Sequence, residues 1–175
     1  MPKLHDFTYN WWTKLLADGK LNEWLKKLYW AEIRGAKRFT DIYFKYGSFD
    51  VIEEIIEDEY NHSDFVKTLL NLNNVEIGDE PTVERYWDSV YLGVDDFKTA
   101  CAAAAYGEML ARNRFKIILE HPDTPSDVRF LVALILPDEE EHAEILGQFA
   151  GKDAMNKIKP FHKNGMNALG IVYED

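Results

Sequence analysis

Cysteine is almost missing from this chain, since Cys101 is the only one among 175 residues. A single thiol excludes an internal disulfide, a zinc site with several cysteine ligands, and a self-contained iron–sulfur or rubredoxin-like centre. Long apolar runs are missing too, because the longest, 100–106 and 130–136, fall far short of the ~20 residues of a membrane-spanning helix. The opening MPKLHDFTYNWW lacks the basic-then-apolar order of a signal peptide. We therefore expect a soluble, cytoplasmic protein that does not contact a membrane.

Positive charge is also scarce. Lysine and arginine number 20 against 31 acidic residues, which gives a net charge of −11, so nucleic acids and anionic membranes are poor partners for this surface. Hydrophobic residues make up 46% of the chain, which is typical of a globular protein with a buried core. No low-complexity stretch or Gly/Ser linker divides the sequence. These features predict one domain over residues 1–175.

Strand signals are nearly absent, and helical periodicity dominates instead. After a short amphipathic segment at 7–16, long helices are expected over about 21–46, 50–72, 95–120 and 125–150, and residues 152–175 should form a further helix and a tail. The stretch between the second and third long helices, with a short helix through 83–87, has the length of a connection that crosses a whole bundle. The predicted fold is all-α: a four-helix bundle with its core at about 21–150, a long crossover between helices two and three, and short terminal helices.

Pro137 falls inside the fourth of these long helices. Proline removes a backbone hydrogen-bond donor, and its ring clashes with the preceding turn. We therefore expect the helix to kink or break just before Asp138.

One short pattern occurs twice. Residues 58–62 read DEYNH and residues 138–142 read DEEEH, so each repeats Asp-Glu-x-x-His. An acidic, solvated helix face with scattered histidines is the simplest explanation. However, residues three, four and seven apart share a helix face, and Ile55 and Val66 flank Glu59 on its face as Ile135 and Leu146 flank Glu139. A solvated charge does not belong on such an apolar stripe.

The other two long helices also carry a glutamate on the inner stripe. Glu32 lies among Leu28, Gly35 and Phe39, and Glu108 lies among small and apolar residues of its own helix. Buried carboxylates cost several kcal/mol each unless they are neutralised, paired or bound to metal. Together with His62 and His142, the four glutamates carry a charge of −4, which two divalent cations cancel. Carboxylate and imidazole ligands suit iron or manganese.

The aspartates that precede each Glu-x-x-His have a role of their own. A histidine that binds metal usually donates its second N–H to a carboxylate. We expect Asp138 to pair with His62 and Asp58 to pair with His142, across the bundle.

This pattern resembles the ferritin-like di-iron carboxylate superfamily, in which Glu, Glu-x-x-His, a long crossover, Glu and Glu-x-x-His follow in that order. The six matching residues span about 21–150, and they are Glu32, Glu59, His62, Glu108, Glu139 and His142. The resemblance implies a ferritin-like four-helix bundle that holds two iron ions, with a manganese–iron pair as the alternative. It leaves the reaction open, because the superfamily includes ferroxidases, peroxidases, oxygenases, hydroxylases and radical-forming subunits.

Two departures from relatives in this superfamily are informative. Rubrerythrins carry an additional glutamate one turn after the ligand on the third helix, where this chain has Ala111. Bacterioferritins place a haem-binding methionine just after the glutamate of the second helix, where this chain has Tyr60. Aldehyde-deformylating oxygenases and bacterial multicomponent monooxygenases are similar to this chain in having the six ligands without the extra glutamate.

Small side chains precede Glu108 on its helix. Cys101, Ala104 and Ala105 are candidates to line a substrate cavity beside the metals, although alanine also favours helices and close helix packing, and Cys101 is equally explained as a small buried hydrophobe. His5, His121 and His162 lack carboxylates at ligand spacing, so we expect them on the surface.

The preferred function is that of a di-iron oxidoreductase that activates O₂, as an oxygenase or hydroxylase of a small or medium organic substrate. The metals do the chemistry in a dry, shaped cavity, and electrons come from an external donor. The alternative is a ferroxidase or peroxide-scavenging protein without an organic substrate, and a third reading is a helical interaction module with a structural metal. A monomer or homodimer is expected for the oxygenase, and a large shell for the ferroxidase.

Overall fold

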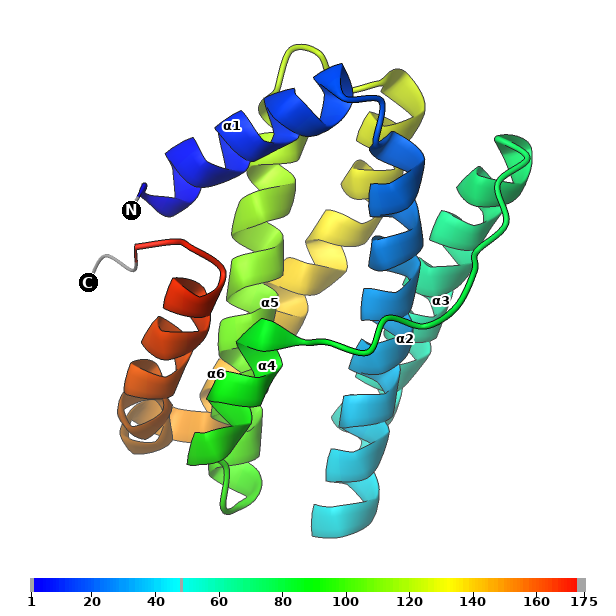
Figure 1. Cartoon of the computed structure of the whole chain (residues 1–175). Helices are drawn as coiled ribbons and strands as arrows, with labels where there is room; N and C mark the ends of the chain where they lie inside the picture. Colours follow the sequence, from blue (N-terminus) through cyan, green and yellow to red (C-terminus); the bar gives the residue numbers. More distant parts are fainter. Residues whose placement is uncertain (1, 48, 173–175) are drawn as a thin grey trace.

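The computed structural model describes residues 2–47 and 49–172, which form an all-helical protein (Figure 1). Its helices are α1 (Leu4–Ala17), α2 (Leu21–Tyr46), α3 (Asp50–Leu72), α4 (Arg85–Val90), α5 (Phe97–Glu120) and α6 (Ser126–Ala168), and a 3-10 turn, η1, covers Tyr91–Gly93. The β pairing among these residues is one isolated bridge between Lys3 and Val172. The all-α prediction is confirmed. Residues 173–175 of the predicted tail lie outside the described residues.

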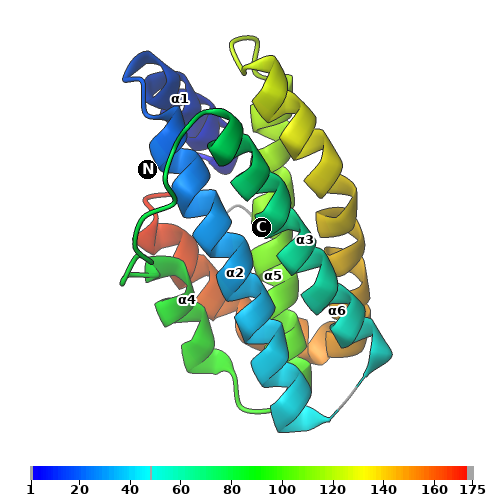
Figure 2. The ribbon, with the colours of Figure 1, turned by 90° about the vertical axis from the view of Figure 1, so that its right-hand side faces the viewer.

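The long helices α2, α3, α5 and the first part of α6 lie side by side with similar axes (Figure 2). Helix α2 packs on α3, and α5 packs on α6. Their buried apolar residues form two clusters, one around Phe39 and Ile55 and the other around Leu28 and Val66. On α2 and α3, therefore, Glu32 and Glu59 lie in the sequence between residues of the two apolar clusters. Glu108 and Glu139 have the same placement on α5 and α6.

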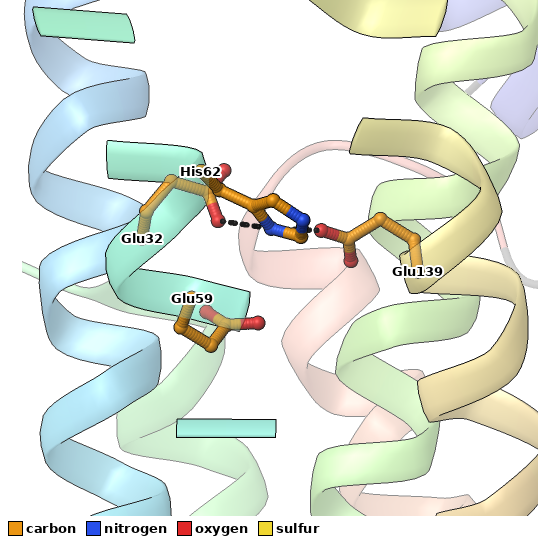
Figure 3. A group of neighbouring side chains, drawn as sticks. All are labelled: Glu32, Glu59, His62 and Glu139. Carbon is orange, nitrogen blue, oxygen red and sulfur yellow. Dashed lines mark ion pairs between the residues drawn. The ribbon is translucent and has the colours of Figure 1, made fainter. Parts of the chain in front are cut away.

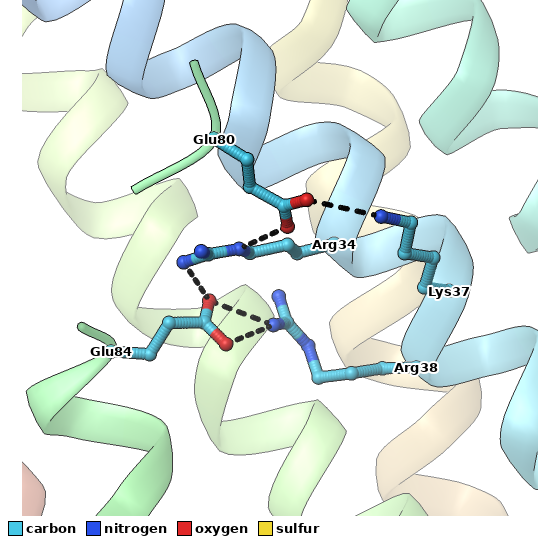
Figure 4. Close-up of polar contacts among 5 residues, drawn as sticks. All are labelled: Arg34, Lys37, Arg38, Glu80 and Glu84. Carbon is cyan, nitrogen blue, oxygen red and sulfur yellow. Dashed lines mark hydrogen bonds and ion pairs between the residues drawn. The ribbon is translucent and has the colours of Figure 1, made fainter. Parts of the chain in front are cut away.

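The segment from 73 to 96 carries the chain from the end of α3 to the start of α5 at the opposite end of the molecule (Figure 1). It runs along α2, where an ion-pair network fixes it (Figure 4). Arg34 Nε donates to Glu80 at 2.9 Å, and Arg38 donates to Glu84 at 3.1 Å. The short helix expected within this segment is α4, which starts two residues later than predicted.

Helix α6 does not break where the sequence predicts. Its backbone stays helical through Pro137, and the non-helical residue is Gly151, with φ 71° and ψ 168°. Pro137 is exposed, and so is Ala133, whose carbonyl loses its partner, so water can satisfy that carbonyl. Of the kink or break predicted at Pro137, the break is therefore wrong, whereas a kink without loss of the helical backbone stays a prediction. The helix end expected near 150–151 is confirmed by the non-helical angles of Gly151. Only glycine adopts these angles without strain.

Beyond Gly151, the remainder of α6 turns back and packs against α4 (Figure 1). At the other end of the molecule, α1 crosses over the ends of the long helices and packs on α5. No helix within residues 2–47 and 49–172 is long and apolar enough to cross a membrane.

Candidate metal centre

The structure brings all six predicted ligand residues to the middle of the four long helices. They come from α2 (Glu32), α3 (Glu59, His62), α5 (Glu108) and α6 (Glu139, His142), and none is more than 8% exposed. In Figure 3 the side chains of Glu32, His62 and Glu139 converge between α2, α3 and α6, with Glu59 one turn below. The helical spacing therefore puts Glu and His of each Glu-x-x-His on the same inward face.

Two groups of possible metal ligands occur within this cluster. Glu32, Glu59, His62 and Glu139 form one, and Glu59, Glu108 and His142 form the other. Within each group, one ligand atom of every residue lies within 4.8 Å of the others. Glu59 belongs to both groups, so its carboxylate lies between two adjacent positions for a cation.

Each histidine of the cluster is held by an aspartate from the opposite helix, as the sequence predicts. His62 Nε2 lies 3.0 Å from Asp138 Oδ2, and His142 Nε2 lies 3.2 Å from Asp58 Oδ2. An ionised carboxylate can only accept, so Nε2 carries the hydrogen in both rings. In the neutral ring, the other nitrogen, Nδ1, then offers a lone pair, which is the form that binds metal.

Four atoms of the cluster are buried and lack hydrogen-bond partners within the described residues. They are Glu59 Oε1, His62 Nδ1, Glu139 Oε2 and His142 Nδ1. His62 Nδ1 lies 3.4 Å from Glu139 Oε1, and His142 Nδ1 lies 3.7 Å from Glu59 Oε1. Buried polar atoms are rarely left unsatisfied, and lone pairs that face one another repel unless a proton or cation lies between them. The residues therefore fit a bound metal ion.

The electrostatics of the cluster lead to the same result. Burial raises the pKa of Glu59, and burial followed by the charge of Glu59 raises the pKa of Glu108. The pKa of Glu139 is raised well above its usual range by burial and by Glu108. Burial alone would lower the pKa of His62, but Glu139 and Glu32 outweigh it and raise that pKa to about 12. Without a cation, the cluster thus takes up protons.

Because Gly35 has no side chain, the carboxylate of Glu59 can lie against α2 at this position. A Cβ atom at Gly35 would lie 1.8 Å from Glu59 Oε2, so no larger residue fits beside this rotamer. The sequence shows Gly35 only as a neighbour of Glu32 on α2. The contact with α3 that makes glycine necessary depends on how the two helices pack, and no pattern within one helix reveals it.

A cavity of about 370 Å³ lies between α2 and α5 and reaches Glu32 and Glu139. On α5 it is lined by Gly107 and Ala111, among others. Ala111 lies one turn after Glu108 on α5, so the cavity extends along the helix next to this glutamate.

The predicted substrate-cavity residues do not line this cavity. Cys101, Ala104 and Ala105 are buried in the apolar cluster around Phe39 and Ile55. Burial also raises the pKa of the Cys101 thiol to about 12, as for an inert, apolar side chain. Their role beside a substrate stays a prediction.

Two histidines expected on the surface are buried, so that prediction is wrong for them. His121 is 1% exposed, with Nε2 2.8 Å from the Thr13 hydroxyl of α1. His162 is 5% exposed, and its Nδ1 lies 2.7 Å from the Tyr86 hydroxyl of α4. Both partners are distant in sequence, so the spacing of nearby residues carries no signal for them. His5 is exposed, as expected.

No family model, curated protein or solved structure gives a significant match to this chain. The resemblance to the ferritin-like di-iron superfamily thus rests on the six ligand residues and on their arrangement. What the structure shows is a helical protein with a buried carboxylate–histidine cluster that can hold a metal ion.

Proposed function

We propose that the protein is a ferritin-like four-helix bundle, with a crossover between α3 and α5, and that it holds two iron ions at the buried cluster. A manganese–iron pair is the alternative occupant. The observation that carries the proposal is the pair of histidines, each anchored at Nε2 by an aspartate and each presenting an unpartnered Nδ1 to buried carboxylates. This is the arrangement of a metal ligand with its outer hydrogen bond.

The division of ligands follows from the two groups. Glu32 and His62 would hold one ion, Glu108 and His142 would hold the other, and Glu59 is shared by the two groups. Glu139 belongs to the first group and would be a further ligand of that ion. Four carboxylates and two neutral imidazoles carry a charge of −4, which two divalent ions cancel.

We propose further that the centre activates O₂ to oxidise a small or medium organic substrate, as an oxygenase or hydroxylase. A bound pair of ferrous ions supplies the reduction of O₂. The chain itself fixes the imidazoles through Asp58 and Asp138, excludes water with the apolar clusters on either side, and offers a cavity next to Glu32 and Glu139. Electrons come from an external donor protein.

The cavity favours an organic substrate over the ferroxidase and peroxide-scavenging alternatives. A ferroxidase needs only a path for ions and O₂, whereas a volume of about 370 Å³ lies in the range of pockets for small organic molecules. Alanine at position 111 leaves that space open. In a peroxide scavenger that resembles rubrerythrin, a carboxylate would fill it.

Rapid mixing of the ferrous protein with O₂ and, separately, with H₂O₂ tests the reaction. The proposal predicts faster oxidation by O₂ for the wild type, and a gain in the rate with H₂O₂ for Ala111→Glu. Gel filtration of the same sample should show a monomer or a homodimer. A wild type that reacts faster with H₂O₂, or that elutes as a large shell, would assign the protein to the scavengers or ferroxidases instead.

A further inference from the structure

Arg114 is a half-buried cation without a matching anion among the described residues. It lies on α5, and its Nε atom is buried and has no hydrogen-bond partner within the described residues. Burial lowers its pKa to about 10, and no neighbouring charge offsets this, so the guanidinium stays charged at neutral pH. The other arginine at the same cavity, Arg38, is paired with Glu84. Withdrawing a charge from water without a counter-ion is costly, so an anion beside the buried Nε of Arg114 would be favourable.

The Arg114 side chain lines the cavity that reaches the metal centre. Its guanidinium stacks on the ring of Trp11, 4.6 Å from the centroid, which fixes the plane of its N–H groups. The exposed Lys27 of α2 lines the same cavity and adds a second positive charge. Between these cations and the glutamates, the lining residues of α2 and α5 are small or apolar, with Leu28, Ala31 and Ala111 as examples.

The lining of the cavity therefore differs along its length. Near Arg114 it attracts an anion and can bind a carboxylate through two parallel hydrogen bonds. Farther along α2 it reaches Glu32 and, from α6, Glu139, which metal would occupy in the loaded protein. A ligand that fits both parts has an acid group and an apolar body.

We propose that this cavity binds a small organic carboxylate, with its acid group on Arg114 and its apolar body directed toward Glu32 and Glu139. This proposal rests on the proposed function, because it names the class of substrate that the metal centre would oxidise. The binding site itself consists of residues other than the metal ligands, so it can be tested on its own. The apolar end of the substrate, rather than its acid group, then lies nearest the metals.

Calorimetric titration with octanoate and with octanamide tests the role of Arg114. The two probes have the same chain and differ in charge, and the full-length protein is used in its metal-free form. We expect octanoate to bind at least about tenfold more tightly than octanamide, because only the carboxylate pairs with the guanidinium. Equal affinities, or no binding of either probe, would overturn the proposal.

Variants assign the preference to one residue. Arg114→Gln should remove the preference for octanoate and leave the weaker binding of octanamide. Arg112→Gln is the matched control, since Arg112 lies on the same helix and does not line the cavity, and it should keep the full preference. Arg114→Lys keeps a charge at the position and should keep part of the preference, which covers the case in which the glutamine variant does not fold. An unchanged preference in Arg114→Gln would contradict the assignment.

The orientation of the ligand is tested with Mn²⁺ as the metal. Paramagnetic relaxation should be faster for the terminal methyl protons of octanoate than for the protons beside its carboxylate. The opposite order would place the acid group on the metal and overturn the proposed orientation. Failure to bind Mn²⁺ or Fe²⁺ would overturn the proposed function, whereas the calorimetric preference in the metal-free protein would still decide the Arg114 site.

Discussion

At the scale of single residues, the metal centre depends on contacts that lie just outside the ligand set. Asp138 and Asp58 are each 40% exposed, so they are not held in place by burial. Their hydrogen bonds to His62 and His142 join α3 to α6 and set which nitrogen of each ring faces the cluster. Replacing either aspartate alters the hydrogen bond of its histidine but leaves that histidine in place as a ligand.

Asp138→Asn should weaken metal binding by about 10–100-fold and leave the fold intact, because the amide of asparagine is neutral and holds the His62 tautomer less firmly. A competition titration against a chelator of known affinity measures the change. Asp64→Asn, on the exposed face of α3, serves as the control and should bind metal like the wild type. Equal affinity in both variants would show that the hydrogen bond to His62 does not act on the metal.

Gly35→Ala should separate metal binding from stability. The added Cβ would lie 1.8 Å from Glu59 Oε2, so the carboxylate must leave its place and metal affinity should fall. The metal-free protein should lose little, since alanine stabilises a helix interior by about 0.5–1 kcal/mol relative to glycine. Gly147→Ala is the control, because nothing lies within 4 Å of its added Cβ. Metal affinity like that of the wild type in Gly35→Ala would mean that Glu59 does not need this position.

At the scale of the elements, α6 owes its shape to Gly151. The backbone there has φ 71° and ψ 168°, a region that is essentially restricted to glycine. The turn positions the end of α6 against α4, where His162 meets Tyr86.

Gly151→Ala should therefore lower the free energy of unfolding by about 1–3 kcal/mol, because a side chain is strained at these angles. Chemical denaturation measures the effect. Gly147→Ala, four residues earlier in the same helix, is expected to be neutral or slightly stabilising. Similar stabilities for the two variants would contradict the strain assigned to Gly151.

The same elements show how far the sequence predicts this structure. The inward faces of α3 and α6 follow from local spacing, so the convergence of Glu59, His62, Glu139 and His142 was predictable. Even the cross-pairing with Asp58 and Asp138 follows, because a metal-bound imidazole needs an outer acceptor.

Features that depend on contacts between distant segments were not predictable in this way. The burial of His121 requires α1 to cross the bundle, and the need for Gly35 arises from the rotamer of a glutamate on another helix. Pro137 was predicted to kink or break α6, yet the helix continues through it on an exposed face, where water can replace the lost partner. The lining of the cavity with Arg114 comes from α1, α2, α5 and α6, so it depends on how distant segments pack.

At the scale of the whole molecule, the folded metal-free protein binds more protons than the unfolded chain. The pKa values of Glu59, Glu108 and Glu139 are raised, so the folded protein holds protons that the unfolded chain has released. The raised pKa values of His62 and His142 act in the same direction. Stability from these groups is therefore gained as the pH falls and lost as the pH rises.

Between pH 8 and about pH 7, the free energy of unfolding of the metal-free protein should increase by about 1 kcal/mol or more, since one extra bound proton contributes ~1.4 kcal/mol per pH unit. His162, whose pKa burial lowers to about 4, acts oppositely only below its ordinary value of 6.5 and so does not interfere in this range. The metal-loaded protein should show no such gain, because metal has replaced the protons. If the free energy of unfolding of the metal-free protein stays constant or decreases as the pH is lowered from 8 to 7, the raised pKa values of the cluster are excluded.

Anaerobic titration of the metal-free protein with Fe²⁺, with bound iron counted per chain after removal of excess metal, tests the central claim most directly. The account predicts about two ions for the wild type and for Glu57→Ala, whose side chain is exposed on α3. His142→Ala should lose one ion, whereas Glu59→Ala should weaken both, because Glu59 belongs to both ligand groups. One ion or none in the wild type, or two ions retained in Glu59→Ala, would contradict a shared two-metal centre.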